Sequence, residues 1–187
     1  MPRVFDIAVA AVALLVLSPF LLAAAIAIKL GSRGPVIYRQ RRVGLDGVEF
    51  ELLKLRTMVE GSDPVGYGTV VTRDDPRVTR AGRFLRRTSL DELPNLVNVL
   101  RGEMAIVGPR PTIPAQVRDY TPRQHRRHEV RPGLTGLAQV QGRAGIPWAE
   151  RIELDVEYVE RRSAALDARI LARTAALLLT GHGLAPD

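Results

Sequence analysis

The sequence predicts a helix-rich α+β fold, in which a membrane-embedded N-terminal helix precedes a small globular domain. Three features support this expectation. Residues 7–28 form an uncharged, almost wholly apolar run of 22 residues. Residues 35–58 read as two short strands around a tight turn, and several later segments carry apolar residues at helical spacing. We therefore expect a membrane anchor over residues 1–32 and a globular domain over residues 33–187.

The apolar run is long enough to enter a bilayer. At about 1.5 Å per residue, an unbroken helix of this length would just cross a hydrocarbon core of roughly 30 Å. A cleavable signal peptide fits poorly, because the run exceeds the usual apolar region and the following IKLGSRG offers no cleavage site of small residues. The rest of the chain is too polar to surround this helix. The segment therefore belongs in lipid.

Ser18 and Pro19 interrupt the run and predict a bend. Pro19 has no N–H for the carbonyl of Leu15, and the Ser18 hydroxyl can bond to the carbonyl of Leu14. Positive charges flank both ends of the run, whereas a spanning helix usually has one strongly basic side. The residues alone therefore leave two topologies open: a spanning helix, and a re-entrant hairpin that enters and leaves the same leaflet.

The globular domain begins with a strong turn signal, because Asp46 and Gly47 form a dipeptide typical of β-hairpins. Residues 60–79 are rich in Gly, Pro and Asp and predict a loop, and AGRFLRR predicts a short basic helix. Prolines make residues 104–116 extended and rigid. Helices are expected over three further ranges: 114–130, 147–163 and 165–183. The apolar part of residues 165–183 is too short to span a bilayer, so we expect an amphipathic helix on the core or on the membrane surface.

The protein is strongly basic, with a formal net charge of +7, 25 arginines and only 2 lysines. This charge favours an anionic partner, which could be nucleic acid, an acidic lipid surface or a phosphorylated small molecule. Arginine suits phosphate because its guanidinium can bind two phosphate oxygens at once. The absence of cysteine excludes disulfides, thiolate metal sites and thiol nucleophiles.

Asp91 and Glu92 stand side by side in the sequence TSLDELPNLVNVL. One interpretation is a capping box at the start of a helix, with Ser89 as N-cap and Glu92 reaching back, although Pro94 would then fall where the helix needs an N–H. The other is a site for a divalent metal and phosphate, because Mg²⁺ is normally held by one or two carboxylates together with substrate phosphates. A helix N-terminus and nearby cations would keep Asp91 ionised, as a nucleophile requires. The cations in question are Lys54, Arg56, Arg86, Arg87 and Arg110.

Residues 79–111, TRAGRFLRRTSLDELPNLVNVLRGEMAIVGPRP, resemble the core signature of the bacterial sugar transferases, which are monotopic phosphoglycosyl transferases. Three other segments resemble further motifs of this family: KLRTM at 54–58, RPGLTGLAQVQGR at 131–143 and LDVEYV at 154–159. The similarity covers nearly the whole chain, including the apolar N-terminus. The chain resembles the minimal form of the family, which lacks a multi-helix extension ahead of the core.

The resemblance implies transfer of a sugar-1-phosphate from a UDP-sugar to polyprenyl (undecaprenyl) phosphate, with release of UMP. This is the first membrane step of glycoconjugate or exopolysaccharide biosynthesis. It implies a ping-pong cycle in which Asp91 is the nucleophile and carries a covalent phosphosugar. Glu92 matches the neighbour that helps to hold Mg²⁺ and assists the attack, so Asp91 and Glu92 are also the implied metal ligands.

The resemblance also assigns the basic residues and the topology. Basic positions near the phosphates match Lys54, Arg56, Arg86 and Arg110, with Arg131 and Arg143 as further contacts. The N-terminal helix is expected to be re-entrant and broken at Ser18-Pro19, which holds the catalytic domain at the cytoplasmic face of the bacterial inner membrane, among its lipids. No nucleic acid partner is implied, and a homo-oligomer stays open. Leu137 and Gln141 replace an aromatic residue and an asparagine often found there, which affects sugar or nucleotide contacts but not the chemistry.

Two alternatives to this function follow from the residues. A basic membrane-anchored protein could bind nucleic acid or acidic lipid without catalysis, with the two carboxylates as helix caps. That alternative explains the charge and the apolar N-terminus but not a carboxylate pair among cations. A Mg²⁺-dependent phosphohydrolase could use the same aspartate with water as acceptor.

Overall fold

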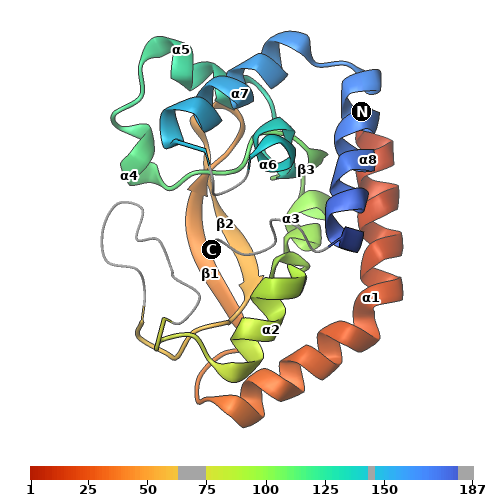
Figure 1. Ribbon diagram of the computed structural model, residues 1–187, viewed down its shortest axis with the longest axis vertical. Helices are drawn as coiled ribbons and strands as arrows, with labels where there is room; N and C mark the ends of the chain where they lie inside the picture. The colour runs from red at the N-terminus through yellow and green to blue at the C-terminus, as the bar shows by residue number, and fades with distance from the viewer. Residues whose placement is uncertain (63–74, 143–145, 181–187) are drawn as a thin grey trace.

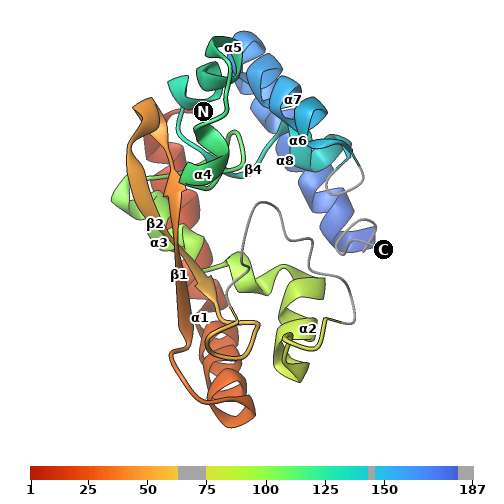
Figure 2. The same ribbon diagram turned by 90° about the vertical axis from the view of Figure 1, so that its left-hand side faces the viewer.

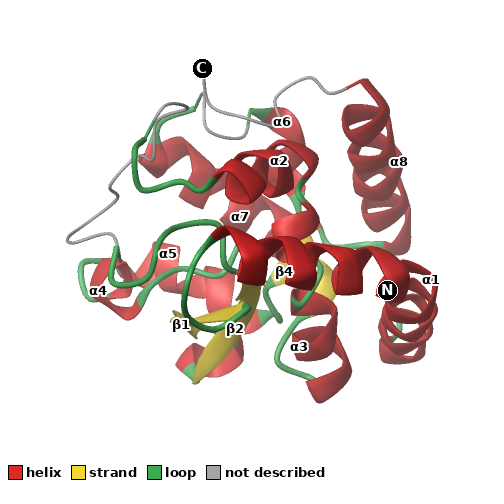
Figure 3. Ribbon diagram, turned by 90° about the horizontal axis from the view of Figure 1, so that it is seen from below, coloured by secondary structure: helices red, strands yellow, loops and turns green. Residues whose placement is uncertain are grey.

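The structure is a computed structural model that describes residues 1–62, 75–142 and 146–180. It confirms the helix-rich α+β architecture, with a few short strands among many helices (Figure 3). Most of the predicted loop at 60–79, the end of the predicted C-terminal helix and Arg143 lie outside the described residues.

The first helix, α1 (Arg3–Gly31), contains the whole apolar run. Its most apolar 18-residue window has a mean hydropathy of 2.6, and only 6% of that window is buried against the protein. By length and composition the helix could cross a membrane. Exposed apolar side chains of this kind are unfavourable in water, so the helix requires an apolar surrounding outside the protein.

α1 bends part-way along its length (Figure 1). Pro19 lies inside the helix and cannot donate to the carbonyl of Leu15. The Ser18 hydroxyl donates to this same carbonyl at 2.8 Å, and not to that of Leu14 as expected from the sequence. Ser18 therefore satisfies the acceptor that Pro19 leaves unpaired, which matters because an unpaired carbonyl is costly in lipid.

The N-terminal end of α1 is fixed to the globular part of the protein. The Arg3 guanidinium donates to the carbonyl of Met104 at 3.0 Å. The carboxylate of Asp6, which is buried, accepts a hydrogen bond from the backbone N–H of Ile106 at 3.1 Å. Ala10 is buried in the main hydrophobic core. The first turns of the predicted anchor are therefore part of the globular packing.

The C-terminal end of α1 is fixed to the same globular part. Arg56 donates to the backbone carbonyl of Ser32 at 2.9 Å, just beyond the last residue of the helix. Ile28 packs in a second buried cluster with Leu55 and Leu85. Both ends of α1 thus contact one body of protein, although a straight helix of 29 residues would separate them by about 40 Å.

The predicted hairpin is present. Strand β1 (Ile37–Val43) pairs antiparallel with β2 (Glu49–Leu55), and the strands run along one edge of the molecule (Figure 2). The turn places Asp46 and Gly47 at φ values of 54° and 77°, which this dipeptide tolerates better than most. Tyr38 pairs with Lys54, and alternate residues of a strand share a face. Arg42 therefore projects from the same face of the hairpin as Lys54.

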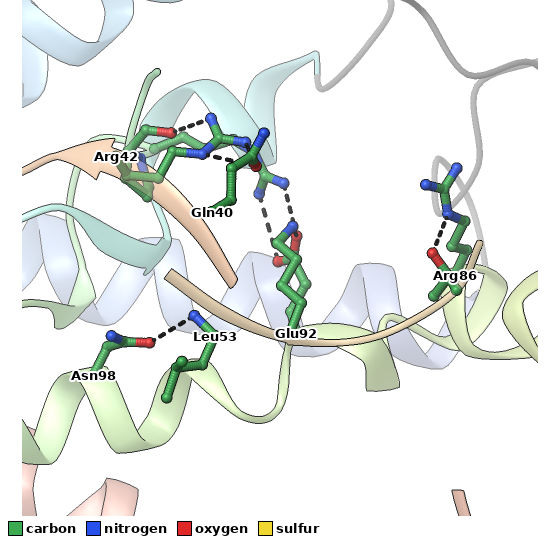
Figure 4. A network of polar contacts seen from close by, with 10 residues as sticks. Gln40, Arg42, Leu53, Arg86, Glu92 and Asn98 are labelled. Carbon is green, nitrogen blue, oxygen red and sulfur yellow. Dashed lines mark hydrogen bonds and ion pairs between the residues drawn. The ribbon is translucent and has the colours of Figure 1, made fainter. Parts of the chain in front are cut away.

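A buried asparagine joins this hairpin to helix α3 (Asn95–Arg101). The Asn98 Oδ1 accepts from the Leu53 N–H at 3.1 Å (Figure 4). Its Nδ2 donates to the Glu51 carbonyl at 2.7 Å. The side chain therefore pairs backbone groups of β2 that the hairpin itself does not pair. This contact holds β2 against the middle of α3.

Two short parallel strands follow, β3 (Ala105–Val107) and β4 (Gly133–Thr135). Just beyond β3, Gly108 meets Gly133 so closely that a Cβ on Gly133 would lie 2.1 Å from the Gly108 nitrogen. Only glycine permits this approach. The proline-rich segment after β3 is therefore held directly against β4.

A continuous helix over 114–130 is wrong. Three short pieces occupy this range: α4 (Pro114–Val117), α5 (Pro122–His125) and a 3₁₀ turn, η3 (Arg126–Glu129). Pro114 and Pro122 each start a helix at its first turn and lack the N–H needed to continue an earlier one.

The remaining helices are α6 (Leu137–Gln141), α7 (Trp148–Arg161) and α8 (Ala164–Thr180), and α7 confirms the helix predicted over 147–163. Leu137 is buried in the main core. In α8, Asp167 and Ile170 are buried, so this helix packs on the core.

Candidate active site

The two adjacent carboxylates lie in a tight turn between helices. Helix α2 (Arg80–Thr88) matches the predicted basic helix and ends at Ser89, whose φ of 57° is left-handed. The 3₁₀ turn η2 (Leu90–Glu92) follows at once. An N-cap residue needs an extended backbone, and Ser89 makes no side-chain cap bond here. The capping-box interpretation is therefore wrong, and the expected helix starts only at Asn95, after Pro94.

Glu92 is bound by two cations from distant parts of the chain. Its Oε1 accepts from the Lys54 Nζ at 2.7 Å and from an Arg110 Nη at 2.7 Å, and its Oε2 has only a longer contact of 3.5 Å to Arg110. The Glu92 side chain is 24% exposed, so solvent screens these charges only partly. Burial by itself would raise the pKa of Glu92, but the charges and hydrogen bonds of Arg110 and Lys54 outweigh it and hold the pKa well below its usual range. Glu92 is therefore an anion and a poor proton acceptor at neutral pH.

Asp91 differs from its neighbour in having no bound cation. Within the described part of the chain, no group donates a hydrogen bond to the Asp91 carboxylate or lies within ion-pair distance of it. Burial raises the pKa of Asp91 to about 6, and the charge of Glu92 adds to the increase, while Lys54, Arg86 and Arg110 oppose it. The expected helix N-terminus is not present at Asp91. The carboxylate is nevertheless mostly ionised at neutral pH, and its oxygens are available for reaction.

Arg86 lies on the other side of Glu92 from Arg42 (Figure 4). Its Nε donates to the Thr57 hydroxyl at 3.0 Å. Burial lowers the pKa of Arg86, and the negative charge of Asp91 opposes this change. Arg86 is thus an electrostatic neighbour of Asp91 and belongs to the same charged group as Lys54 and Arg110.

The other predicted cations lie elsewhere. Arg56 is buried and donates to Ser32 at the end of α1. Arg131 is exposed and donates to the carbonyl of Gly102 at 2.9 Å, and no contact within the described ranges joins it to either carboxylate.

A small hollow opens beside Glu92, and Arg42 forms part of its wall. Its charged and polar lining consists of Arg42, Lys54, Glu92, Asn95 and Arg110. The sequence motifs did not single out Arg42. Strand alternation could have found it, because Arg42 shares a face of the hairpin with Lys54 while Arg39 and Arg41 are exposed on the other face.

Arg110 is held in place by buried groups behind it. It lies between Pro109 and Pro111, and its backbone carbonyl accepts a 2.8 Å hydrogen bond from Arg127. Arg127 also pairs with Asp155 on α7, and both side chains are almost fully buried. Burial raises the pKa of Asp155 to about 6, against the opposing charge of Arg127.

The carboxylates could hold a divalent cation only together with a substrate. No group of three or more His, Asp or Glu side chains gathers as a metal site within the described ranges. Among the described residues, no cation is bound to Asp91, and Glu92 Oε2 has only the one long contact. Two carboxylate oxygens combined with substrate phosphates match the usual coordination of Mg²⁺, so the residues fit this ion.

Comparison with known proteins gives the family. The model of the family described as bacterial sugar transferase matches residues 1–181. The chain belongs to this family. It is thus a bacterial sugar transferase in which the anchor, the carboxylate pair and the surrounding cations all fall within the matched region.

Individual relatives cover most of this bacterial sugar transferase. An uncharacterized sugar transferase of Bacillus subtilis, EpsL, is 42% identical over 97% of this chain and 89% of that protein. A UDP-glucose:undecaprenyl-phosphate glucose-1-phosphate transferase of Caulobacter vibrioides is 47% identical over 95% of this chain and 69% of its own length. The exopolysaccharide production protein ExoY of Rhizobium meliloti is 39% identical over 97% of this chain and 86% of that protein. Relatives of this kind are enzymes, and so the non-catalytic binding protein is set aside.

The Arg127–Asp155 pair generates a prediction on stability. Asp155→Ala leaves the Arg127 charge buried without its partner, and we expect the free energy of unfolding to fall by about 3–5 kcal/mol. Glu160→Ala, on the same helix, removes only exposed pairs with Arg123 and Arg126 and should cost about 1 kcal/mol or less. Denaturant unfolding in detergent, followed by the fluorescence of Trp148, measures both. Equal losses in the two variants would contradict a supporting role of the buried pair.

Proposed function

We propose that this bacterial sugar transferase moves a sugar-1-phosphate from a UDP-sugar to undecaprenyl phosphate, through a covalent intermediate on Asp91. The observation that carries the proposal is the difference between the two carboxylates. The ionised Glu92 carboxylate is paired with Lys54 and Arg110, whereas Asp91 beside it has no bound cation among the described residues. The relatives named as UDP-glucose:undecaprenyl-phosphate glucose-1-phosphate transferases support glucose as the first sugar to test.

The proposed chemistry has two displacements at one phosphorus. In the first, a carboxylate oxygen of Asp91 attacks the phosphorus that carries the sugar, the bond to the bridging oxygen breaks, and UMP leaves. In the second, a phosphate oxygen of undecaprenyl phosphate attacks the same phosphorus. The bond to Asp91 breaks, which regenerates the carboxylate and gives undecaprenyl diphosphate-sugar. A covalent intermediate lets the polar donor and the lipid acceptor react in separate steps.

The cations around Asp91 suit this reaction. A diphosphate would be repelled by two carboxylates alone, but the charges of Lys54 and Arg110 balance those of Glu92 and Asp91. The partly buried Arg86 makes the group as a whole positive. Positive groups fixed before the reaction stabilise charge on the transferring phosphoryl group without reorganisation. Glu92 acts by holding these cations and not by removing a proton.

We propose that Mg²⁺ is bound by Asp91 and by Oε2 of Glu92, together with substrate phosphates. Bound Mg²⁺ would neutralise phosphate oxygens and so reduce the repulsion between the donor and the carboxylates. Two features of the described residues support this assignment: Glu92 Oε2 has only a long contact to Arg110, and no cation is bound to Asp91.

We propose that α1 is re-entrant and enters the cytoplasmic leaflet only. Three observations support this: the bend at Ser18-Pro19, the hydrogen bond that satisfies Leu15, and the contacts of both ends of α1 with the same globular body. A spanning helix would place its ends on opposite sides of a hydrocarbon core of about 30 Å. A re-entrant helix instead keeps the active site at the surface where a cytoplasmic nucleotide and a membrane lipid meet.

The covalent intermediate predicts the effect of removing the nucleophile. With UDP-glucose and Mg²⁺ but no acceptor, the wild-type protein should gain the mass of a phosphoglucosyl group on Asp91 and release up to one equivalent of UMP. Asp91→Asn should show no adduct and at least about a thousandfold less UMP release with acceptor present. Asp46→Asn, at the exposed hairpin turn, is the control and should retain full activity. An active Asp91→Asn variant would refute the assignment.

The same assay separates transfer from hydrolysis. Transfer requires undecaprenyl phosphate for turnover beyond the first equivalent of UMP. Continued UMP release without acceptor would instead support the phosphohydrolase.

Removal of the metal gives a further prediction. EDTA should stop UMP release, and added Mg²⁺ should restore it. Glu92→Gln should raise the Mg²⁺ concentration for half-maximal activity by about tenfold or more, because one charged ligand is lost. An unchanged Mg²⁺ dependence in this variant would show that Glu92 does not hold the ion.

The topology can be tested by labelling, because the chain has no cysteine and each introduced one is unique. Pro2→Cys and Asp46→Cys are at exposed positions, before α1 and in the hairpin turn. A membrane-impermeant maleimide should label both in inverted inner-membrane vesicles and neither in intact spheroplasts. Phe20→Cys, beside the bend and exposed on α1, should resist labelling in both because it lies in lipid. Labelling of Pro2→Cys only from the spheroplast side would establish a spanning helix.

A further inference from the structure

Arg42 is held in a fixed orientation on the inner face of the hairpin. Its Nε and one terminal nitrogen donate to the Gln40 Oε1 at 3.1 and 2.6 Å, and the other terminal nitrogen donates to the Pro111 carbonyl at 2.9 Å (Figure 4). A guanidinium has five N–H groups, so these three bonds leave one on each terminal nitrogen. Neither remaining N–H has an acceptor among the described residues. Two N–H groups on the terminal nitrogens of one guanidinium can bind two oxygens of one phosphate.

The charge of Arg42 has no bound counter-ion in the described part of the chain. Its hydrogen-bond partners are neutral, and Glu92, whose charge acts on it, is already shared by Lys54 and Arg110. Burial and the charge of Arg110 lower the pKa of Arg42 to about 10, with Glu92 opposing. Three cations therefore surround one carboxylate. Partly buried like charges repel one another unless an anion joins them.

The hollow beside Glu92 gives such an anion a place. Arg42, Lys54 and Arg110 all line it, so an anion there would contact cations from three segments of the chain. Asn95 also lines it, and its Oδ1 is buried without a donor within the described residues. An acceptor of this kind can bind a hydroxyl or N–H group of a ligand that brings the phosphate.

We propose that Arg42 binds a phosphate group of a substrate directly, with Gln40 as the positioning residue that orients its guanidinium. The proposal rests on the proposed function, which supplies two sources of phosphate: the diphosphate of the sugar nucleotide and the phosphate of the lipid acceptor. Both have the oxygens that the two remaining N–H groups of Arg42 require.

The two half-reactions distinguish the sources. Adduct formation on Asp91 is followed with UDP-glucose alone, and discharge of the adduct with undecaprenyl phosphate. Arg42→Met should raise the substrate concentration for the half-maximal rate by about tenfold or more in the half-reaction whose phosphate it binds. Arg42→Lys keeps the positive charge but lacks the paired N–H groups of a guanidinium, so it should raise this substrate concentration by a smaller factor. Arg41→Met is the matched control, since Arg41 is the neighbouring arginine on the exposed face, and should match the wild type.

A structural role would give a different result. Arg42 could act only by holding Pro111, and through it Arg110. Arg42→Met would then lower the maximal rate and leave both concentration dependences unchanged, which would overturn the proposal. Unchanged kinetics in both half-reactions would also overturn it.

Binding without chemistry separates this proposal from the proposed function. Asp91→Asn protein is titrated with UDP by calorimetry, alone and combined with Arg42→Lys or Arg42→Met. If Arg42 binds the donor, the combined variant with Arg42→Met should bind UDP about tenfold more weakly or worse, and the one with Arg42→Lys should show a smaller loss, even if no adduct ever forms on Asp91. If neither UDP binding nor acceptor discharge depends on Arg42, the proposal fails while the covalent mechanism stands. Arg42→Lys serves for both assays where Arg42→Met does not fold.

Discussion

The ion pairs of Glu92 hold the candidate site together. Lys54 comes from β2 and Arg110 from the proline-rich segment after β3, and both bind one oxygen of a carboxylate in η2. Without this anion the two cations would repel each other and the three segments would lose their common contact. The same pairing divides the work of two adjacent carboxylates. Glu92 is held in two ion pairs and stays ionised, whereas no described residue bonds to the carboxylate oxygens of Asp91.

Helix α1 and the site are coupled through the end of β2 and the residue that follows it. Lys54 binds Glu92, and Arg56, two residues along the chain, binds the end of α1 at Ser32. At about 3.3 Å per residue, these two positions are separated by only about 7 Å along an extended chain. In the membrane topology proposed above, the position of this helix end would set the height of the site above the lipid. The bend in α1 matters for the same reason, since it lets the opposite end of the helix dock at Met104 and Ile106.

Local patterns in the sequence correctly predict the apolar helix, the hairpin at Asp46-Gly47, α2 and α7. They do not predict features that depend on contacts between residues far apart in the sequence. The sequence SLDE at Ser89 matches a capping box in its residue types, with Pro94 against it, but Lys54 and Arg110 bind the Glu92 side chain instead of the backbone. Arg42 belongs to no recognised motif, and its place beside Arg110 depends on how Pro111 packs against the hairpin. The carboxylate pair could be predicted from the sequence, because two acidic residues stand together among many cations. The different electrostatic roles of Asp91 and Glu92 could be assigned only from the structure.

Several segments that resemble motifs of the family contain no reacting group. In the structure, these segments hold the backbone around Arg110 in place. Gly108 and Gly133 let the chain after β3 lie against β4, where the Gly133 N–H donates to the Pro109 carbonyl at 2.9 Å. Arg127 holds the next carbonyl, and Asp155 in LDVEYV holds Arg127. The hydrogen bonds to the carbonyls of Pro109 and Arg110 fix this backbone before substrate arrives, which removes part of the freedom that binding would otherwise have to restrict. The signature therefore specifies the support of one guanidinium as much as the reacting carboxylate.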